Sequence, residues 1–553
     1  MRSKCLIFLW ALSLIPHAFC FNALLISIGA AGHVTPMFEL AKAMKNHNVT
    51  FLTEQLAQSY VDFKSYSNSL SFRVVYANDS PDAFIVQKKI EQQVTAYSAN
   101  HSLLDGLSYA TTLLGDSATS LLNKTVHILM LERFDVIIAN SLLGSVRILC
   151  KVVNAPCVIQ STESLFNIFD FNQPNSYSLL SSKQLTEIKY RLYNVAFTFR
   201  LTMSVVKILV PSFYKMLQSA PRVPGPFYES FALTNVLFSK PKCLELISIP
   251  PSFYTPSYSN HYTKYLGPFV DETSIDHADD DLTNWINSKP IDSIIYTAFG
   301  STSVIKVDRM QNLLNGLVAF LLQTPGSSVL VAFRSANYET YQTVLSDIKN
   351  DEFRRILNDD QRVKVENGFV KQKWILQQNS VKLFFSHCGM GSSLEALYFQ
   401  KPVLCIPFGM DQFVNAIVID RSSVGLSLFV PPSPLQSLIN PLDFTDYKFS
   451  ASSVTTKLSI MWRNAATYKK AVRIMSLEMK HAGGLRRAVE EIEFLVNLDG
   501  DLDRYAPFST TLPFCQRYML DLVMIYVVLP AAIITYFVVK CCNSRLKVGL
   551  AVT

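Results

Sequence analysis

The chain has 553 residues, of which 49% are hydrophobic and 17% charged, and its formal net charge at pH 7 is +7. That length exceeds one ordinary core and predicts two domains of roughly 200 residues each plus additional segments. The apolar content excludes a disordered protein. No basic cluster with interleaved aromatic residues is present, which argues against nucleic acid as a partner.

The N-terminal residues 1–20 read as a secretory signal peptide. Arg2 and Lys4 precede an apolar run from Cys5 to Ile15, and Pro16 to Cys20 follow it. This order of charge, apolar run and short end segment is typical of a cleaved leader, and the run is too short to span a membrane.

The C-terminal residues 518–539 read as a transmembrane helix. Leu522 to Val539 are 18 residues without a charge, enough to cross a bilayer with slight help from the flanks. Lys540, Arg545 and Lys547 follow, so the positive-inside rule places the tail, residues 540–553, in the cytoplasm. We therefore predict a single-pass type I membrane protein whose main part faces the lumen.

The sequons and the cysteines fit a lumenal location. Four N-x-S/T triplets occur, although such triplets also arise by chance: Asn48, Asn78, Asn100 and Asn123. Six cysteines lie between the terminal segments, with a spacing that indicates neither a disulfide framework nor a metal site: Cys150, Cys157, Cys243, Cys388, Cys405 and Cys515. We expect most to be buried small side chains, and a disulfide in an oxidising lumen stays open.

The first segment after the leader predicts a βαβ unit. Ala23 to Ile28 form an apolar strand, Gly29 to Gly32 a loop, and a helix starts at about Pro36. Val49 to Leu52 begin the next strand. This order predicts a Rossmann-like domain.

A second strand of this domain ends at an informative residue. Phe134 to Ala139 read as a strand, and its unbroken apolar run Val136-Ile137-Ile138 is typical of a strand covered on both faces. Asn140 stands at its carboxyl end, where α/β sheets place their ligands. A helix through Val153 and a strand from Cys157 to Gln160 follow.

Residues 165–240 are rich in aromatic side chains and carry no motif. Within them, Val195 to Val210 are strongly apolar but contain Arg200 and Lys207, so the run is too short and too charged for a second span. A helix in the core or at an acceptor pocket is the default interpretation. A helix at the membrane interface is the alternative.

Residues 267–290 are polar and read as a domain linker. A second α/β pattern begins directly after them. Its predicted strands are Ile294–Phe299, Val329–Phe333, Leu383–Ser386 and Val403–Ile406.

The segment from Glu366 to Ala416 carries the densest chemistry. The strand ending at Ser386 runs into the turn His387-Cys388-Gly389-Met390-Gly391-Ser392, and a helix begins near Ser393. A glycine-rich turn before a helix N-terminus is a phosphate site, because backbone N–H groups point at the anion. Glu395 can accept hydrogen bonds from a ribose diol, and Trp374 offers a flat face for a uracil ring. Asp411 and Gln412 can bind sugar hydroxyls.

This segment resembles the signature of the UDP-glycosyltransferase family, whose glucuronosyltransferase branch is anchored in the endoplasmic reticulum membrane. The matching steps are Trp374 with Gln377, His387-Cys388-Gly389 with Ser392, Glu395, and Asp411-Gln412, with Leu376 where the family has proline. The resemblance implies that Trp374 stacks on uracil, that Gln377 and Glu395 hold the ribose, that His387, Gly389 and Ser392 hold the diphosphate, and that Asp411 and Gln412 hold the donor sugar. Ser301, in the Phe299-Gly300-Ser301 step, can support the phosphates.

The resemblance also implies a fold class and a division of the chain. It implies an α/β protein of GT-B architecture, with two Rossmann-like domains facing a cleft plus the C-terminal helix. Residues 21–266 would bind the acceptor and residues 291–470 the UDP-sugar. Residues 471–517 would form a helical return and a juxtamembrane segment. The location would be the endoplasmic reticulum.

His33 is the candidate general base, since it follows the first strand and matches the family's catalytic histidine. The family usually orients that histidine with an aspartate at the position of Asn140. An asparagine carbonyl can accept the same hydrogen bond but carries no charge. We therefore expect an inverting transferase, with a membrane-tethered pseudoenzyme as the alternative. The implied partners are UDP-glucose or UDP-glucuronate and a small lipophilic acceptor, with no metal. Homo-oligomerisation stays open.

Overall fold

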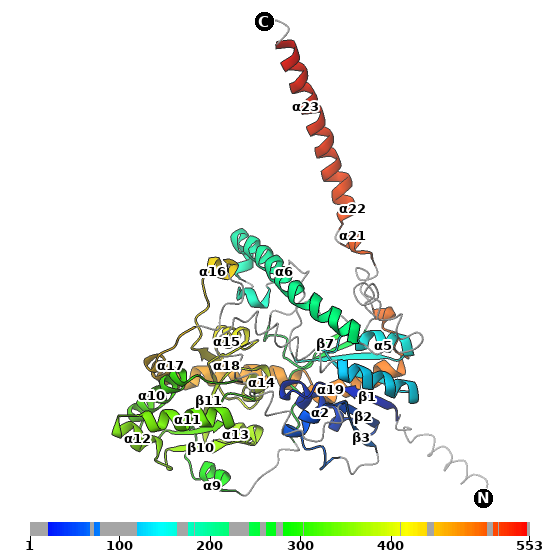
Figure 1. Ribbon diagram of the computed structural model, residues 1–553. Coiled ribbons are helices and arrows are strands. Elements are labelled where there is room, and N and C mark those ends of the chain that lie inside the picture. The colour runs from blue at the N-terminus through cyan, green and yellow to red at the C-terminus, as the bar shows by residue number, and fades with distance from the viewer. Residues whose placement is uncertain are drawn as a thin grey trace, which may run out of the picture. The chain divides into compact units, whose positions relative to one another are not determined.

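A computed structural model describes residues 20–66, 71–77, 119–162, 175–181, 183–219, 243–254, 262–272, 280–301, 303–409, 411–439, 447–505, 512–517 and 519–549 (Figure 1). Residues 1–19 of the predicted leader, Asn78, Asn100 and the last four residues of the predicted tail lie outside these ranges. The chain divides into two compact units. The first comprises residues up to 259 and 263–501, and the second comprises residues 260–262 and 502–553.

The first unit contains two parallel sheets, and the N-terminal one has seven strands. Their order is β3-β2-β1-β4-β5-β6-β7, and every neighbouring pair is parallel. The strands are β1 Asn22–Ile26, β2 Asn48–Thr53, β3 Phe72–Tyr76, β4 Val136–Asn140, β5 Cys157–Ser161, β6 Leu244–Ile247 and β7 Thr263–Tyr265. The sequence order reverses between β1 and β4, which places the carboxyl ends of these two strands at a topological switch point.

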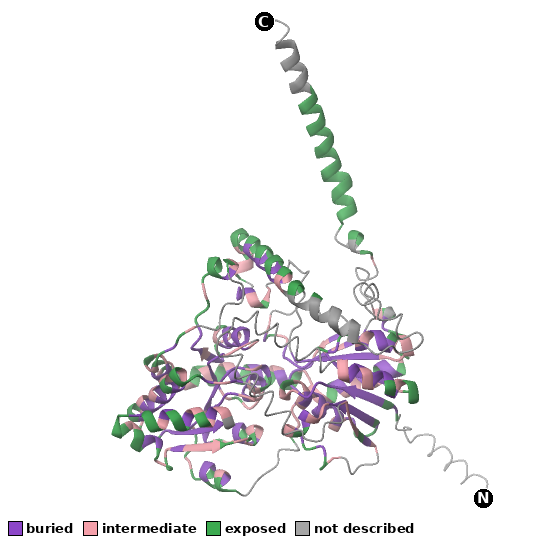
Figure 2. Ribbon diagram, viewed as in Figure 1, coloured by how far each residue is buried: buried purple, intermediate pink, exposed green. Residues whose placement is uncertain are grey.

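Helices pack on this sheet because its strands are apolar on both faces (Figure 2). One buried cluster joins Leu24 and Ile137 of the strands to Ile128, in the helical residues 119–131, and to Cys150. The helices and short 3-10 turns of this part are α2 Ala31–Ala43, α5 Val146–Val153, α6 Ile188–Ser219, η1 Gln55–Ser59, η2 Ser176–Ser178 and η3 Gln184–Thr186.

The start of α2 differs from the prediction. The helix begins at Ala31 and not at Pro36, so Gly32 and His33 lie in its first turn and not in a loop. Pro36 is the sixth residue of the helix, so its ring removes one intrahelical hydrogen bond, the one that an N–H there would donate to the Gly32 carbonyl.

The second sheet has six parallel strands in the order β10-β9-β8-β11-β12-β13. They are β8 Ile294–Ala298, β9 Ser328–Phe333, β10 Val363–Asn367, β11 Val381–Ser386, β12 Val403–Cys405 and β13 Gly425–Ser427. The order reverses between β8 and β11, which gives this sheet its own switch point.

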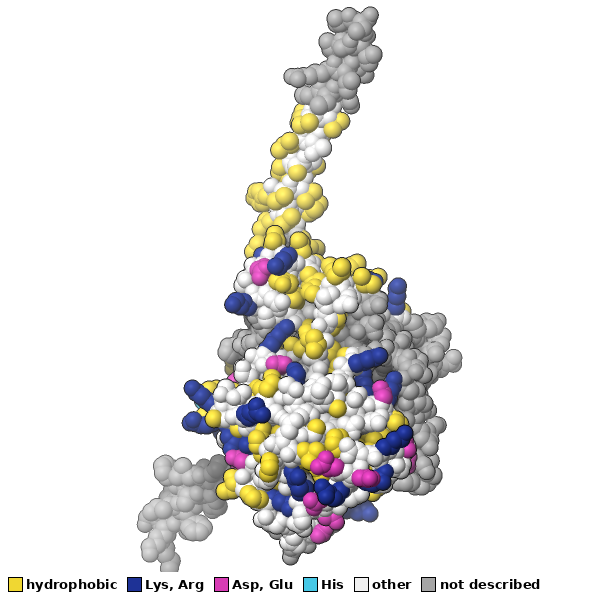
Figure 3. Space-filling model, turned by 90° about the vertical axis from the view of Figure 1, so that its left-hand side faces the viewer, with side chains coloured by type: hydrophobic (Ala, Val, Ile, Leu, Met, Phe, Trp, Pro, Cys, Tyr) yellow, Lys and Arg dark blue, Asp and Glu magenta, His cyan; other side chains and the backbone are white. Residues whose placement is uncertain are grey.

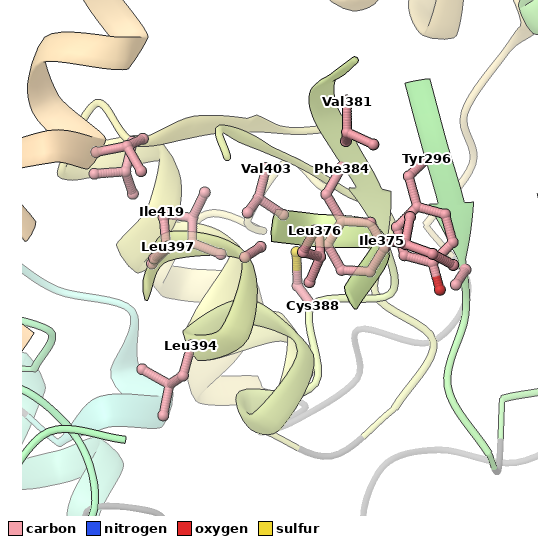
Figure 4. Close-up of a cluster of buried hydrophobic side chains, with 14 of the residues drawn as sticks. Tyr296, Ile375, Leu376, Val381, Phe384, Cys388, Leu394, Leu397, Val403 and Ile419 are labelled. Carbon is pink, nitrogen blue, oxygen red and sulfur yellow. The ribbon is translucent and has the colours of Figure 1, made fainter. Parts of the chain in front are cut away.

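Alternating side chains of these strands enter two cores, one on each face. Tyr296 and Phe384 stack with ring centroids 4.9 Å apart in the core that Ile375 and Leu397 complete (Figure 4). Ile295 and Phe385 enter the opposite core. The helices in residues 281–497 are α9 Asp281–Asn287, α10 Val307–Gln323, α11 Ser335–Asp347, α12 Asp351–Leu357, α13 Gln372–Gln377, α14 Met390–Tyr398, α15 Gln412–Arg421, α16 Pro434–Ile439, α17 Ala451–Arg463, α18 Ala465–His481 and α19 Gly484–Asn497.

Two of these helices bear on the predicted domain boundaries. Helix α9 falls inside the predicted linker 267–290, and its Trp285 and Ile286 are buried in the core of the second sheet. Helix α19 packs against α2 of the first sheet, where Glu493 lies 2.9 Å from Nε2 of His47. The polar composition of the linker thus concealed a short helix with one apolar face.

The cysteines form two disulfides among the described residues, although their spacing had not indicated a framework. Cys157 is bonded to Cys243, which joins β5 to the residue before β6. Cys388 is bonded to Cys405, which joins the turn after β11 to the end of β12. Cys150 is a free, buried thiol, as expected for a small core side chain.

The second unit is mainly helical. It contains η4 Asp503–Tyr505, α21 Phe514–Arg517, α22 Leu520–Val523, a π-helical turn η5 Met524–Val528 and α23 Leu529–Gly549. Residues Leu520–Lys540 are long and apolar enough to cross a membrane, and none of this span is buried (Figure 2).

Candidate active site

The switch point of the second sheet gathers several of the predicted donor residues. Gly300 and Ser301 follow β8, and His387 follows β11, the neighbouring parallel strand. Because both strands end at the same edge of the sheet, these residues meet there.

His387 fills the space between two glycines at this edge. A Cβ atom built on Gly300 would lie 2.4 Å from Nε2 of His387, and one built on Gly389 would lie 2.5 Å from it. Burial lowers the pKa of His387 to about 4, against an opposing hydrogen bond to the Ala298 backbone, so the imidazole is neutral at pH 7. The neutral ring therefore packs between the two backbone turns.

Helix α14 presents its N-terminus to the same edge. Gly389 is its N-cap residue, and Ser392 lies in its first turn. The helix therefore begins before the expected Ser393. A helix N-terminus of this kind can bind an anion, and the backbone of Met390 in this turn is hydrogen-bonded to the Asp411 carboxylate.

A hydrogen-bonded group of side chains lies beside this helix. Gln372 donates through Nε2 to Oε2 of Glu395 at 2.7 Å and to Oγ of Ser392 at 3.2 Å. Burial raises the pKa of Glu395, and the charge of Lys373 opposes that rise. The structure thus brings Glu395 and Ser392 together, and Gln372, which the sequence had not indicated, joins them.

The structure does not bring Trp374 and Gln377 to this group. Trp374 is 7% exposed and lies in the core below the sheet with Ile375 and Leu376. Gln377 is exposed at the end of α13. The physical reason is the helix itself, whose apolar Trp374-Ile375-Leu376 run must be buried.

Phe369 is the aromatic side chain that this edge exposes instead. It follows β10, is 59% exposed, and stacks under the guanidinium of Arg334 at 3.7 Å from the ring centroid. Phe369 and Gln372 have the same aromatic-x-x-Gln spacing as Trp374 and Gln377. The signal that separates the two pairs is position, because Phe369 directly follows a strand end and Trp374 opens an apolar run.

Asp411 and Gln412 stand at the start of α15. Burial raises the pKa of Asp411, whose Oδ2 accepts a 2.7 Å hydrogen bond from Asn415. Asn415 also donates to the Cys388 carbonyl at 3.0 Å, which ties α15 to the turn after β11. Oε1 of Gln412 accepts hydrogen bonds from the backbone N–H groups of Phe408 and Gly409. This oxygen therefore holds the loop before α15, whereas the sequence had suggested that Gln412 binds the donor sugar.

The switch point of the first sheet carries His33 and Asn140. His33 lies in the first turn of α2, after β1, and Asn140 is the last residue of the neighbouring strand β4. Burial lowers the pKa of His33 to about 4, so its imidazole is neutral at pH 7 and able to accept a proton.

The expected hydrogen bond between these two residues is not formed. Nδ1 of His33 is buried and has no partner among the described residues. Oδ1 of Asn140 accepts instead from the backbone N–H of Leu142 at 3.1 Å, and its amide nitrogen lies 3.5 Å from Oε1 of Gln160. An asparagine readily closes such a local turn, and without a charge it gains little by facing the imidazole.

An ion pair links the two sheets near these residues. Nζ of Lys373, on α13, lies 2.8 Å from Oε1 of Glu39, on the same helix α2 as His33. Burial disfavours the Lys373 ammonium, but the carboxylates of Glu395 and Glu39 outweigh it and raise the pKa of Lys373. The Lys373 ammonium therefore interacts electrostatically with Glu395 and also forms an ion pair with helix α2.

No protein-family model matches the chain. Among curated proteins, UDP-glycosyltransferase 708A6 of Zea mays is 36% identical over 146 residues, which are 26% of this chain and 29% of that protein. UDP-glycosyltransferase 79A2 of Stevia rebaudiana is 33% identical over 160 residues, 28% of this chain and 32% of that protein. The chain thus spans about a third of the length of these relatives.

Solved structures resemble the chain over most of its length. Phytolacca americana UGT2, complexed with UDP-2fluoro-glucose and pterostilbene, has a TM-score of 0.53 at 14% identity, over 86% of this chain and 99% of that one. Arabidopsis thaliana UGT89C1, complexed with UDP-L-rhamnose, has a TM-score of 0.54 at 15% identity, over 87% and 99%. The chain therefore has the GT-B fold of two α/β domains, and about a quarter of it is similar in sequence to UDP-glycosyltransferases.

Proposed function

We propose that the protein transfers a hexose or hexuronate from a UDP-sugar to a small lipophilic acceptor, with inversion at the anomeric carbon. The observation that carries this proposal is the group at the β8–β11 switch point, where the α14 N-terminus lies beside the Gln372–Glu395–Ser392 hydrogen bonds. An anion site next to a buried carboxylate suits a nucleoside diphosphate, whose phosphates need N–H donors and whose ribose diol needs an acceptor.

In this proposal the donor residues divide by chemistry. Phe369 supplies a ring face for uracil, and Gln372 positions Glu395 for the ribose hydroxyls. Gly300, Ser301, Gly389 and Ser392 surround the diphosphate, with His387 spacing their backbone. Asp411 binds the donor sugar through its hydroxyls.

The transfer itself is a single displacement. The acceptor hydroxyl loses its proton to the neutral imidazole of His33 as its oxygen bonds to the anomeric carbon, and the bond to the diphosphate oxygen breaks. The negative charge that develops on the leaving diphosphate is stabilised by the N–H groups at the start of α14. A single displacement inverts the anomeric centre, and the proposed transfer uses no metal.

The donor is proposed as UDP-glucose or UDP-glucuronate. A glucuronosyltransferase-like specificity rests on the resemblance of the chain's organisation to the membrane-anchored branch. The similar solved structures contain UDP-2fluoro-glucose and UDP-L-rhamnose, and these ligands are those of the neighbouring proteins.

We also propose a single-pass type I location in the endoplasmic reticulum, with the two sheets in the lumen. The apolar helix from Leu520 to Lys540 supports an anchor. The two disulfides support an oxidising compartment, because such bonds are rare in the cytosol.

A membrane-tethered pseudoenzyme is the second candidate, favoured by one observation. Among the described residues Nδ1 of His33 has no hydrogen-bond partner, and Oδ1 of Asn140 is bonded within a local turn, so no carboxylate of this part of the chain strengthens the base. Such a protein would bind UDP-sugar or a lipophilic ligand without efficient turnover.

The test is a UDP-release assay on the full chain in vesicles, with UDP-glucose and UDP-glucuronate and a panel of phenols and sterols. Acceptor-dependent release that is lost in His33→Gln supports the enzyme. Clear binding of UDP, without UDP release from either donor, would contradict the transferase proposal and support the pseudoenzyme.

A further inference from the structure

Helix α6 carries an exposed apolar stripe that the proposed transfer does not use. Its members recur every three or four residues, so they lie on one face of the helix, and each is between 43% and 75% exposed. They are Ile188, Leu192, Val195, Phe199, Met203, Val206 and Val210. At 1.5 Å per residue this stripe is about 33 Å long.

The opposite face of α6 is packed and fixes the helix in place. Tyr193, Phe197 and Leu201 are buried in a cluster with Phe413 and Ile417 of α15. The exposed stripe is therefore the outer face of a helix whose inner face already packs against its own domain.

Basic residues flank the stripe on both sides. Counted at 3.6 residues per turn, Lys189, Arg200 and Lys207 lie along one border and Arg191 along the other. No acidic residue occurs between Ile188 and Ser219. Glu187, just before the helix, is paired with Lys189 at 2.9 Å.

Helix α16 extends the apolar surface. Leu435 and Ile439 are 68% and 57% exposed, and the Leu438 carbonyl accepts a hydrogen bond from Arg200 of α6. Figure 3 shows hydrophobic side chains gathered at one end of this unit, with Lys and Arg side chains beside them.

We propose that α6, with α16 beside it, lies flat on a lipid bilayer, with its stripe in the interfacial region. The proposal rests on the membrane anchoring put forward under the proposed function, because a tether keeps the unit at high effective concentration near lipid. A basic-flanked apolar stripe without acidic residues matches anionic head groups above acyl chains. Lysine and arginine stems can cover the stripe's borders while their charges reach the phosphates.

This arrangement has a consequence for the proposed transfer. The inner face of α6 packs on α15, the helix that begins at Gln412 beside Asp411. The donor side of the site is then separated from the lipid surface by one helix layer, which suits an acceptor that partitions into the bilayer.

The test uses the full chain reconstituted in phosphatidylcholine–phosphatidylserine vesicles. In a Cys515→Ser, Cys541→Ser, Cys542→Ser background, an NBD fluorophore is attached to Phe199→Cys on the stripe. The matched control is Ile474→Cys on α18, which is 59% exposed against 62% for Phe199. Val527→Cys reports on the span. Quenching by nitroxide-labelled lipid is measured for each.

We expect quenching at position 199 at least about threefold above that at position 474. Equal quenching at 199 and 474, with position 527 quenched, overturns the proposal and leaves the anchor intact. Quenching at neither 199 nor 527 overturns both. Quenching at 199 but not at 527 supports lipid contact by α6 and overturns the anchor. Cross-linking of Phe199→Cys between two copies, without lipid quenching, overturns the proposal in favour of a dimer face.

A second variant separates surface docking from catalysis. Phe199→Glu with Met203→Glu is expected to raise KM for a membrane-partitioned acceptor about fivefold or more, with KM for a water-soluble acceptor unchanged, because charges weaken interfacial binding only. Unchanged KM values for both acceptors contradict the proposal. The UDP affinity of this variant is measured alongside, so that loss of the donor site is recognised separately.

Discussion

The imidazole of His387 occupies the space that a side chain at Gly300 would need. A Cβ on Gly300 would lie 2.4 Å from Nε2 of His387, and Gly300 adopts a φ of +72°. The two residues follow β8 and β11, so this contact fixes the spacing of the turns at the switch point of the second sheet.

Gly300→Ala should therefore disable donor binding. The new methyl group must displace a buried ring that has no room to move, and we expect UDP affinity to fall by about tenfold or more. Isothermal titration with UDP measures this. Gly326→Ala is the control, because Gly326 has a similar φ of +85° with nothing within 4 Å of a Cβ. Equal losses in the two variants would show that backbone strain, and not the contact with His387, is responsible.

Asn140→Asp should strengthen the proposed base. Burial holds the pKa of His33 at about 4, so activity that needs the neutral imidazole persists above that pH and is lost as the pH falls through it. A carboxylate at position 140 would favour the imidazolium, which raises the pKa of His33, moves the acidic limb of kcat/KM upward and raises kcat near pH 7 by about tenfold. Asn140→Ala removes the bond to Leu142 without adding charge and should leave the limb in place. An Asn140→Asp profile that overlays the wild type counts against the pairing.

Lys373→Met should shift the pH dependence of donor binding. Burial raises the pKa of Glu395 and Lys373 opposes this, so removing the lysine raises that pKa further. If the ionised Glu395 holds the ribose, UDP binding is present above its pKa and is lost at a higher pH in the variant than in the wild type. Titrations of UDP across the pH range, with the exposed Lys371→Met as the control, measure the shift. A loss that is equal at every pH would assign Lys373 a steric role only.

Removing either disulfide should lower stability, but only removal of the Cys388–Cys405 bond should also weaken donor binding. Cys388 and Cys405 close a short loop that contains helix α14, so Cys405→Ala should lower the free energy of unfolding by about 3 kcal/mol and also weaken UDP binding. Cys243→Ala breaks the bond in the first sheet and should lower stability alone. Thermal unfolding and UDP affinity, measured for both variants, provide the comparison. Identical UDP affinities would remove the Cys388–Cys405 bond from the account of the site.

The sequence was most informative where a strand end coincided with a glycine turn. The apolar runs at β1, β4, β8 and β11 predicted parallel strands, and the turn at His387 predicted the anion site, because strand ends and helix starts are local features. Which of two similar side chains is buried depends on packing in three dimensions, and the local sequence does not show it. Phe369 and Trp374 each lie three residues before a glutamine, and only the buried face of α13 shows that Trp374 belongs to the core.

Side-chain partners were also beyond the sequence. Asn140 could have faced His33 or closed its own turn, and the two options use the same oxygen atom. The Lys373–Glu39 pair joins residues far apart in the chain, which no spacing rule predicts. Likewise, the composition of α6 fits a core helix or an interfacial helix, and exposure alone distinguishes its two faces.

The most direct test of the account is the affinity of the full chain for UDP in Gln372→Ala and Gln377→Ala. Gln372 bonds Glu395 and Ser392 beside the anion site, whereas Gln377 is exposed at the other end of the same helix. Loss of two hydrogen bonds, one of them to a carboxylate, predicts about 1–3 kcal/mol, or an about 5- to 150-fold weaker UDP complex, for Gln372→Ala and no change for Gln377→Ala. A Gln377→Ala loss with Gln372→Ala unaffected would contradict the donor site described here.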